Sequence, residues 1–250
     1  MDHVKLEHRE AVAIVTLVDT ERRNAMTAQM VDEIVETFDA LEAGGITAAV
    51  VITGESPAFC SGADVSNLGA LAEAKSDADR RKITNIYEGF LRVLRSPLPT
   101  VAAVNGPAVG AGMNLALACD VRIVGESGRF DTRFLKIGIH PGGGHTWMLE
   151  RAVGPQTAAA MVLFGQVVTG PRAVELGLAW SCHPDGELIE AATEFAAGAA
   201  RAPVPLLGRT KGTLRQVAWQ PDFEAAIATE VGHQAWSLGQ GWFGSRPSSR

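Results

Sequence analysis

Residues 100–120 read TVAAVNGPAVGAGMNLALACD, and this stretch decides the fold. It begins with five residues typical of a buried strand, continues through small residues, and ends in an apolar run. No charged residue occurs between Arg95 and Asp120. A membrane span is disfavoured because prolines at 97, 99 and 107 would leave backbone groups without partners in lipid. The stretch is therefore interpreted as the buried core of a soluble protein.

Strand and helix patterns alternate on both sides of this stretch. Strands are predicted at residues 12–18, 48–53, 100–104 and 121–124, and helices at 28–43 and 83–94. Thr27 is the expected N-cap of the first helix, and Gly44 and Gly45 end it. Beyond Gly165 the pattern is helical, at residues 171–177, 187–202 and 223–238, with a joint near residue 204. This alternation predicts an α/β fold with right-handed crossovers.

A loose internal repeat refines that prediction. The apolar strand ending at Thr53 leads into the small-residue loop 59–64, FCSGAD, and the strand ending at Val104 leads into 105–112, NGPAVGAG. Two strand-to-loop units of the same kind favour stacked ββα turns over a flat doubly wound sheet.

Charge and cysteine content narrow the class of protein. The 250 residues carry a net charge of −6, so no basic excess favours nucleic acid as a partner. The three cysteines, Cys60, Cys119 and Cys182, form no CxxC pair. An odd, sparse set indicates a reducing compartment, and the acidic first residues show no secretory pattern. A cytoplasmic protein is expected.

The two small-residue loops are the candidate site. A helix that begins near Gly112 presents free N–H groups and the positive end of its dipole. The loop 61–64 offers further N–H groups, so two donors could stabilise one developing oxyanion, as in the enolate of a thioester. Tight packing of a helix end against the sheet is the structural alternative. The sequence contains no GxSxG motif, no GxxxxGK[ST] motif and no GxGxxG motif with a downstream acid. Their absence disfavours, in that order, a serine hydrolase, a nucleotide hydrolase and a nicotinamide-dependent enzyme.

Five ordered motifs give the chain a specific resemblance. They are ERRNAM at 21–26, AFCSGAD at 58–64, NGPAVGAG at 105–112, GIHPGGG at 138–144 and TGPRAVELGLA at 169–179. In this order and spacing, over residues 4–215, the sequence resembles the crotonase family of enoyl-CoA hydratases and isomerases.

The resemblance implies a fold, a ligand and an assembly. A ββα spiral core would occupy residues 1–195, and a C-terminal helical region with a frayed tail, residues 196–250, would build a homotrimer or a dimer of trimers. The ligand would be an acyl-CoA thioester, with coenzyme A as part of the substrate and no permanently bound cofactor. The backbone N–H groups of Ala63 and Ala111 would form the oxyanion hole. The residues implied for coenzyme A are Arg22, Arg23, Asn24, Ala25, Ala63, Asp64, Val65 and Lys211. A solvated turn at Arg22 and Arg23, and a free surface lysine at Lys211, are the structural alternatives.

The sequence departs from the family where its two catalytic acids would stand. Those positions are Asn114 and Phe134, and neither residue accepts a proton at neutral pH. A shift of the alignment would instead bring Asp131 to the second position. Ordinary hydratase and isomerase chemistry is therefore in doubt.

Two histidines are candidate replacements. His140 and His145 flank a Pro-Gly-Gly-Gly turn, and histidine titrates in the range of a general base. The alternative is that His145 caps the following helix and His140 packs in the turn. No metal site is expected, because a third ligand is lacking. Asp64 is interpreted as a loop-stabilising carboxylate and Cys60 as a buried thiol.

The sequence therefore predicts an acyl-CoA-binding protein that polarises a thioester carbonyl. The first hypothesis is a lyase or isomerase with a non-standard acid/base set, acting in fatty-acyl or related acyl-CoA metabolism. The second is a catalytically silent acyl-CoA-binding or carrier protein, which the joint loss of both acids favours. A scaffold without a ligand is disfavoured by the two small-residue loops.

Overall fold

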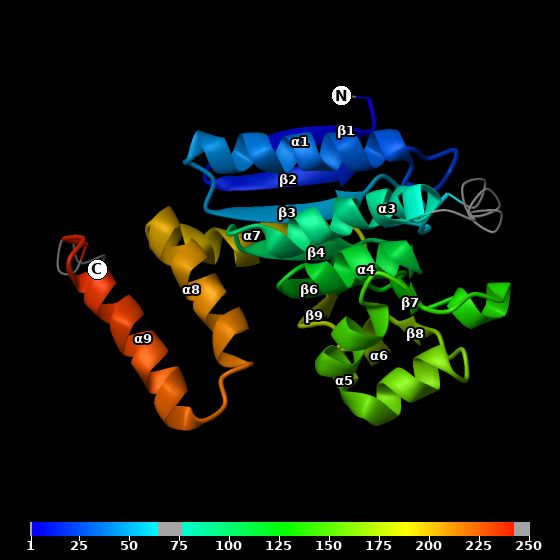
Figure 1. Ribbon diagram of the computed structural model, residues 1–250. Helices are drawn as coiled ribbons and strands as arrows, with labels where there is room; N and C mark the ends of the chain where they lie inside the picture. The colour runs from blue at the N-terminus through cyan, green and yellow to red at the C-terminus, as the bar shows by residue number, and fades with distance from the viewer. Residues whose placement is uncertain (1, 65–76, 243–250) are drawn as a thin grey trace.

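The computed structural model describes residues 2–64 and 77–242 and contains two sheets (Figure 1). The large sheet has the strand order β1-β2-β3-β4-β6-β9, and the small one β5-β7-β8. The strands are β1 Val4–Arg9, β2 Val12–Leu17, β3 Ala49–Gly54, β4 Thr100–Val104, β5 Pro107–Val109, β6 Val121–Gly125, β7 Arg129–Asp131, β8 Val168–Thr169 and β9 Ser181–His183. The helices are α1 Ala28–Gly44, α3 Asp77–Arg95, α4 Ala111–Ala118, α5 His145–Val162, α6 Gly170–Glu175, α7 Leu188–Ala197, α8 Val204–Val217 and α9 Phe223–Leu238, with 3-10 turns η1 Phe134–Ile137 and η2 Gly198–Arg201.

The large sheet is parallel apart from its first hairpin. β1 and β2 pair antiparallel, whereas β2, β3, β4, β6 and β9 follow one another in parallel. Parallel neighbours need crossover connections, which the helices provide. The predicted α/β class and the spiral arrangement are confirmed.

Both faces of the central strands β2, β3 and β4 are buried, which explains why these three strands are almost wholly apolar. Every second residue along these strands, such as Val15, Val50 and Ala102, faces the core under α1, α3 and α4. The alternate residues, such as Ile14 and Val51, face a second cluster with Leu188 and Ala192 of α7. A strand with period-2 side chains in a sheet covered on both faces reads as a continuous apolar run.

The ends of the first long helix confirm the sequence prediction. Thr27 Oγ1 accepts a hydrogen bond from the Met30 amide at 3.1 Å, which satisfies one free donor of the first turn. Gly45 ends α1 in the left-handed conformation at φ 67°. Strand β4 and helix α9 also have the predicted bounds.

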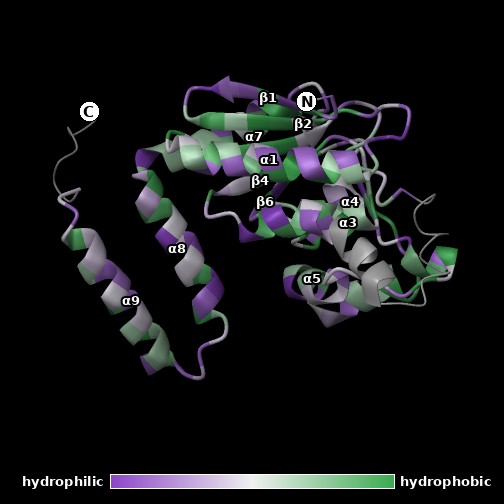
Figure 2. Ribbon diagram, turned by 45° about the horizontal axis from the view of Figure 1, so that its top comes forward, coloured by the Kyte–Doolittle hydropathy of each residue, from purple (hydrophilic) through white to green (hydrophobic). Residues whose placement is uncertain are grey.

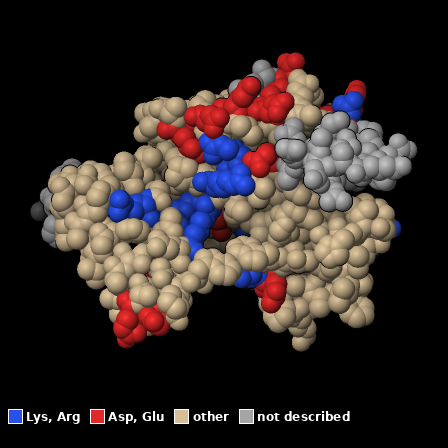
Figure 3. All heavy atoms as spheres, in the orientation of Figure 1, with Lys and Arg blue, Asp and Glu red and all other residues tan. Residues whose placement is uncertain are grey.

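Helices α8 and α9 form an arm that stands off from the body (Figures 1 and 2). On α8 only Lys211 is buried, and α9 has no buried residue. The Lys211 ammonium lies 2.6 Å from an Asp120 carboxylate oxygen and donates to the Leu98 carbonyl at 2.6 Å, so it attaches α8 to the body. Figure 3 shows basic side chains gathered along this junction.

The far end of the arm also contacts the body. The rings of Trp219, after α8, and Trp147, on α5, stack with centroids 5.5 Å apart. The Arg151 guanidinium lies 3.9 Å from the Trp147 ring centroid and 4.6 Å from that of Trp219. Across residues 2–64 and 77–242, no helix combines the length and apolar character needed to cross a bilayer.

Candidate functional site

The two small-residue loops lie side by side, as the repeat suggested. The Cys60 amide donates to the Pro107 carbonyl at 3.1 Å, and the Val109 amide donates to the Cys60 carbonyl at 3.0 Å. A Cβ at Gly112 would collide with the Cys60 carbonyl oxygen, so only glycine permits this approach. These contacts hold the start of α4 against the loop that follows β3.

This approach brings the residues expected to form the oxyanion hole into one cavity. Ala63 and Ala111 both line it, and within the described residues neither amide donates to a main-chain carbonyl. Ala111 is the first residue of α4, whose opening N–H groups have no partners inside the helix. Gly62, at φ 104°, lies so close to Val109 that an added Cβ would be 2.7 Å from the Val109 carbonyl oxygen, so a side chain does not fit there. The role of the Ala63 and Ala111 amides as oxyanion donors stays a prediction.

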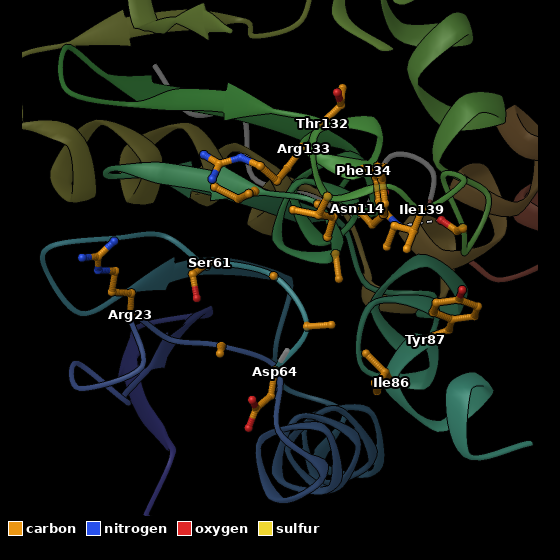
Figure 4. A pocket seen from close by; sticks show the side chains of 18 of the residues that line it. Arg23, Ser61, Asp64, Ile86, Tyr87, Asn114, Thr132, Arg133, Phe134 and Ile139 are labelled. Atoms are coloured by element: carbon orange, nitrogen blue, oxygen red, sulfur yellow. Dashed lines mark hydrogen bonds between the residues drawn. The ribbon is translucent and has the colours of Figure 1, made fainter. Parts of the chain in front are cut away.

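The cavity has a volume of about 580 Å³ and two chemically different ends (Figure 4). Arg23, Ser61 and Arg133 lie toward one end, and Ile86, Tyr87, Phe134 and Ile139 toward the other. An elongated ligand with one polar and one apolar part matches this division.

Asn114 lies in the cavity wall, and both parts of its amide have partners. Its Nδ2 donates to the Gly142 carbonyl at 3.0 Å, and its Oδ1 lies 2.6 Å from His145 Nδ1. Because Oδ1 is an acceptor, His145 donates from Nδ1, which leaves Nε2 as the unprotonated ring nitrogen. Asn114 is thus held in one orientation by the Gly142 carbonyl and by His145, the first residue of α5.

His145 itself is placed behind the cavity wall. It is 1% exposed, its Nε2 has no hydrogen-bond partner among the described residues, and it is not one of the lining residues. Burial lowers its pKa from 6.5 to about 4, so the ring is neutral. The Phe134 ring packs edge-on against it at 4.8 Å between centroids.

The other two candidate bases differ in position. Asp131 is buried, and its carboxylate accepts from Arg133 Nε and Nη2 at 2.9 and 2.6 Å, so it is occupied by an ion pair behind the cavity lining. His140 lines the cavity and is exposed; its Nδ1 lies 2.7 Å from the Pro141 carbonyl. Of the three candidates, only His140 lies at the cavity.

The residues expected to hold coenzyme A fall into two groups. Arg22, Arg23, Ala25, Ala63 and Asp64 line the cavity. Asn24 does not: it is buried and its amide binds the Glu55 and Ala58 carbonyls at 2.7 and 2.8 Å. Lys211 is likewise absent from the cavity, because its ammonium pairs with Asp120. Val65 lies outside the described residues, as does the expected frayed tail from residue 243 onward.

Three further residues bear on the site: Cys60, Tyr87 and Arg133. Cys60 is fully buried, and burial raises the pKa of its thiol to about 12, in agreement with an inert core thiol. Tyr87 and Arg133 also line the cavity, although the sequence did not predict them there. Tyr87 has the same spacing as the core positions of its helix, and burial raises the pKa of its phenol. The position of Arg133 next to Phe134 was the one available signal.

The spiral of parallel strands and helices, the paired small-residue loops and the helical arm are those of a crotonase-type protein. Residues 7–232 match the profile of the enoyl-CoA hydratase/isomerase family, and the chain belongs to that family. The probable enoyl-CoA hydratase EchA14 of Mycobacterium tuberculosis is 44% identical over 250 residues, which cover 98% of this chain and 96% of that protein. The 2,3-dehydroadipyl-CoA hydratase of Escherichia coli is 32% identical, over 92% of this chain and 88% of that one.

Solved structures agree with these sequence relatives. A putative enoyl-CoA hydratase from Thermobifida fusca, in complex with acetoacetyl-CoA, superposes with a TM-score of 0.85 at 30% identity and covers 96% of each chain. An enoyl-CoA hydratase from Polaromonas has a TM-score of 0.87 at 26% identity over 94% of this chain and 91% of that one.

Proposed function

We propose that this protein binds an acyl-CoA thioester in the cavity and stabilises its enolate through the Ala63 and Ala111 amides. The carrying observation is the contact between the two small-residue loops, which places both residues in one cavity. Negative charge moves onto the thioester oxygen as the enolate forms, and amide donors fixed beforehand stabilise that charge most. The complex of a related structure with acetoacetyl-CoA supports this ligand class.

The ends of the cavity support an orientation for the ligand. Arg22 and Arg23 suit the phosphates of coenzyme A, since their guanidinium groups are always charged. The apolar end suits the acyl chain. Coenzyme A arrives as part of the substrate, and the expected compartment is the cytoplasm.

The acid/base set is the unusual part of the proposal. Asn114 and Phe134 occupy the positions of the two family acids, Asp131 is paired with Arg133, and His145 is buried. His140 remains as the candidate proton-transfer group, with Nε2 as its free ring nitrogen. We assign the chain to lyase or isomerase chemistry in which His140 serves as base or acid.

A second candidate function is a silent acyl-CoA-binding protein. The observation that favours it is that the Asn114 amide is fixed by Gly142 and the Phe134 ring packs on His145, so no carboxylate stands at either family position. The two candidates share the ligand and differ in the turnover of that ligand.

Titration calorimetry with acetoacetyl-CoA and a hydration assay with crotonyl-CoA test the proposal together. We expect binding, with hydration about 10²–10⁴-fold below that of an enzyme with both acids, because general acid/base catalysis contributes that factor. If His140→Gln abolishes the remaining turnover while His8→Gln, an exposed position on β1, leaves it unchanged, the enzyme is favoured. Binding without any turnover favours the silent protein. Absence of binding, or hydration at an ordinary enzyme's rate, contradicts the proposal.

A further inference from the structure

Arg133 is held by Asp131 in a way that fixes its guanidinium. Nε and Nη2 both donate to one Asp131 oxygen, at 2.9 and 2.6 Å, and the Arg133 main-chain amide donates to the other at 2.9 Å. The Asp131 side chain is 8% exposed, whereas that of Arg133 is 48% exposed. A guanidinium anchored at one edge keeps its remaining donors in fixed directions, so less side-chain freedom is lost when a ligand binds.

The backbone joins this pair to the candidate oxyanion loop. The Asp131 carbonyl accepts a hydrogen bond from the Gly110 amide at 3.0 Å, one residue before Ala111. Arg133 has φ 58°, a left-handed conformation that residues with bulky side chains seldom adopt. Such conformations concentrate at ligand sites, where the surroundings enforce them.

The unused edge of the guanidinium belongs to the cavity. Nη1 keeps both N–H groups and Nη2 one, and no acceptor for Nη1 is found among residues 2–64 and 77–242. Arg133 lines the cavity at the end where Arg23 also lies (Figure 4). A planar guanidinium matches the paired oxygens of a phosphate or carboxylate.

We infer that Arg133, fixed by Asp131, is an anion subsite for the bound thioester. This inference rests on the proposed function and adds a recognition residue to it. Two parts of such a ligand can carry anionic oxygens: the phosphates of coenzyme A, which the proposed orientation places at this end, and a carboxylate at the far end of the acyl group, which reaches Arg133 only if the ligand lies in the reverse orientation. Because Asp131 balances the charge of Arg133, the subsite acts through directed hydrogen bonds rather than through a net positive field.

Four ligands distinguish the two sources of the anion. Acetyl-CoA, glutaryl-CoA, acetyl-pantetheine and glutaryl-pantetheine combine the presence or absence of phosphates with that of a carboxylate. Calorimetry compares the wild type with Arg133→Gln for each ligand. We expect about 10- to 100-fold weaker binding of the ligands that carry the recognised anion, and unchanged binding of acetyl-pantetheine. A loss confined to the two CoA esters identifies the phosphates, and a loss confined to the two glutaryl esters identifies the carboxylate.

Controls separate recognition from stability. Arg129→Gln changes an exposed arginine of β7 outside the cavity and should leave all four affinities unchanged. Arg133→Lys keeps the charge without the planar fork, so an intermediate loss is expected. Equal affinities of wild type and Arg133→Gln for all four ligands overturn the inference alone. An equal loss for all four with a lower melting temperature also overturns it, since a structural role then suffices. A wild type that binds none of them overturns the proposed function and the inference with it.

Discussion

Asn114 and His145 show how one hydrogen bond changes the chemistry of a position. The bond from His145 Nδ1 to Asn114 Oδ1, at 2.6 Å, occupies one lone pair of the amide acceptor, and Gly142 occupies one amide donor. Asn114 therefore keeps one N–H and one lone pair of Oδ1 for further hydrogen bonds. An amide in this state can hold an oxygen of the substrate, whereas the proton has to be moved by another group.

The buried histidine predicts an acid-sensitive fold. The pKa of His145 falls from 6.5 to about 4 on folding, so the unfolded chain binds the proton more readily. Stability conferred by the neutral ring is complete above pH 6.5 and is lost as the pH falls toward 4, by about 3 kcal/mol in all. Denaturant melts at pH 7.5 and pH 5 measure the loss. In His145→Gln this pH-dependent loss of stability should vanish. An unchanged pH dependence in that variant would refute its assignment to His145.

Ala111→Pro tests the oxyanion donor with little change in volume. Proline removes the Ala111 N–H, and at the first position of α4 its ring is compatible with a helix. An oxyanion donor stabilises the transition state by about 3–4 kcal/mol, so the activation barrier should rise by that amount and kcat should fall about 10²–10³-fold. Acyl-CoA affinity, activity and melting temperature are compared for the two forms. A folded variant with wild-type affinity and activity would show that the Ala111 amide has no such role.

At the scale of elements, the ion pair between α8 and the body is structural in this chain. Asp120, the residue before β6, also accepts from the Thr100 amide at 2.8 Å and from Arg215 at 3.2 Å. Burial lowers the pKa of Lys211, and Asp120 opposes that shift. The buried ammonium is therefore paired with Asp120 rather than with a ligand.

Lys211→Met should accordingly affect stability and not binding. Removing the ammonium takes one partner from Asp120, which keeps Thr100 and Arg215 and is 30% exposed, so we expect a loss of about 2 kcal/mol rather than that of a fully buried pair. Acyl-CoA affinity, measured by calorimetry at a temperature where both forms are folded, should stay the same. A selective loss of affinity would instead place Lys211 in the ligand site, as the resemblance implied.

The elements that the sequence predicts well are those set by local pattern. β4 and α9 have their predicted bounds, and Thr27 caps α1 as expected, because periodicity and caps depend on neighbours in the chain. The pairing of Lys211 with Asp120 spans 91 residues, and no local pattern encodes it. The same holds for Asn24, whose motif predicts a ligand contact while its amide binds the carbonyls of a distant loop.

At the scale of the whole molecule, many apolar side chains of the arm formed by α8 and α9 are exposed to solvent. The apolar side chains that are at least two-fifths exposed on or between α8 and α9 are Leu214, Trp219, Phe223, Ile227, Val231 and Leu238. A single chain rarely leaves a continuous apolar surface of this kind in water. Lys211 and Trp219 attach α8 and the turn after it to the body, so the exposed apolar side chains of α9 are available to a partner subunit.

We predict a trimer or a dimer of trimers in solution, with the arm in the interface. Light scattering at micromolar concentration should give a mass of three or six chains, because closed symmetric assemblies bury such patches without leaving open ends. Phe223→Asp combined with Val231→Asp should shift the mass toward the monomer, since two charges would be desolvated in each interface. Ile46→Asp, a change at an equally exposed position after α1, should not. A monomeric wild type would contradict the assignment, and so would an assembly that tolerates both charges, because the arm would then lie outside the interface.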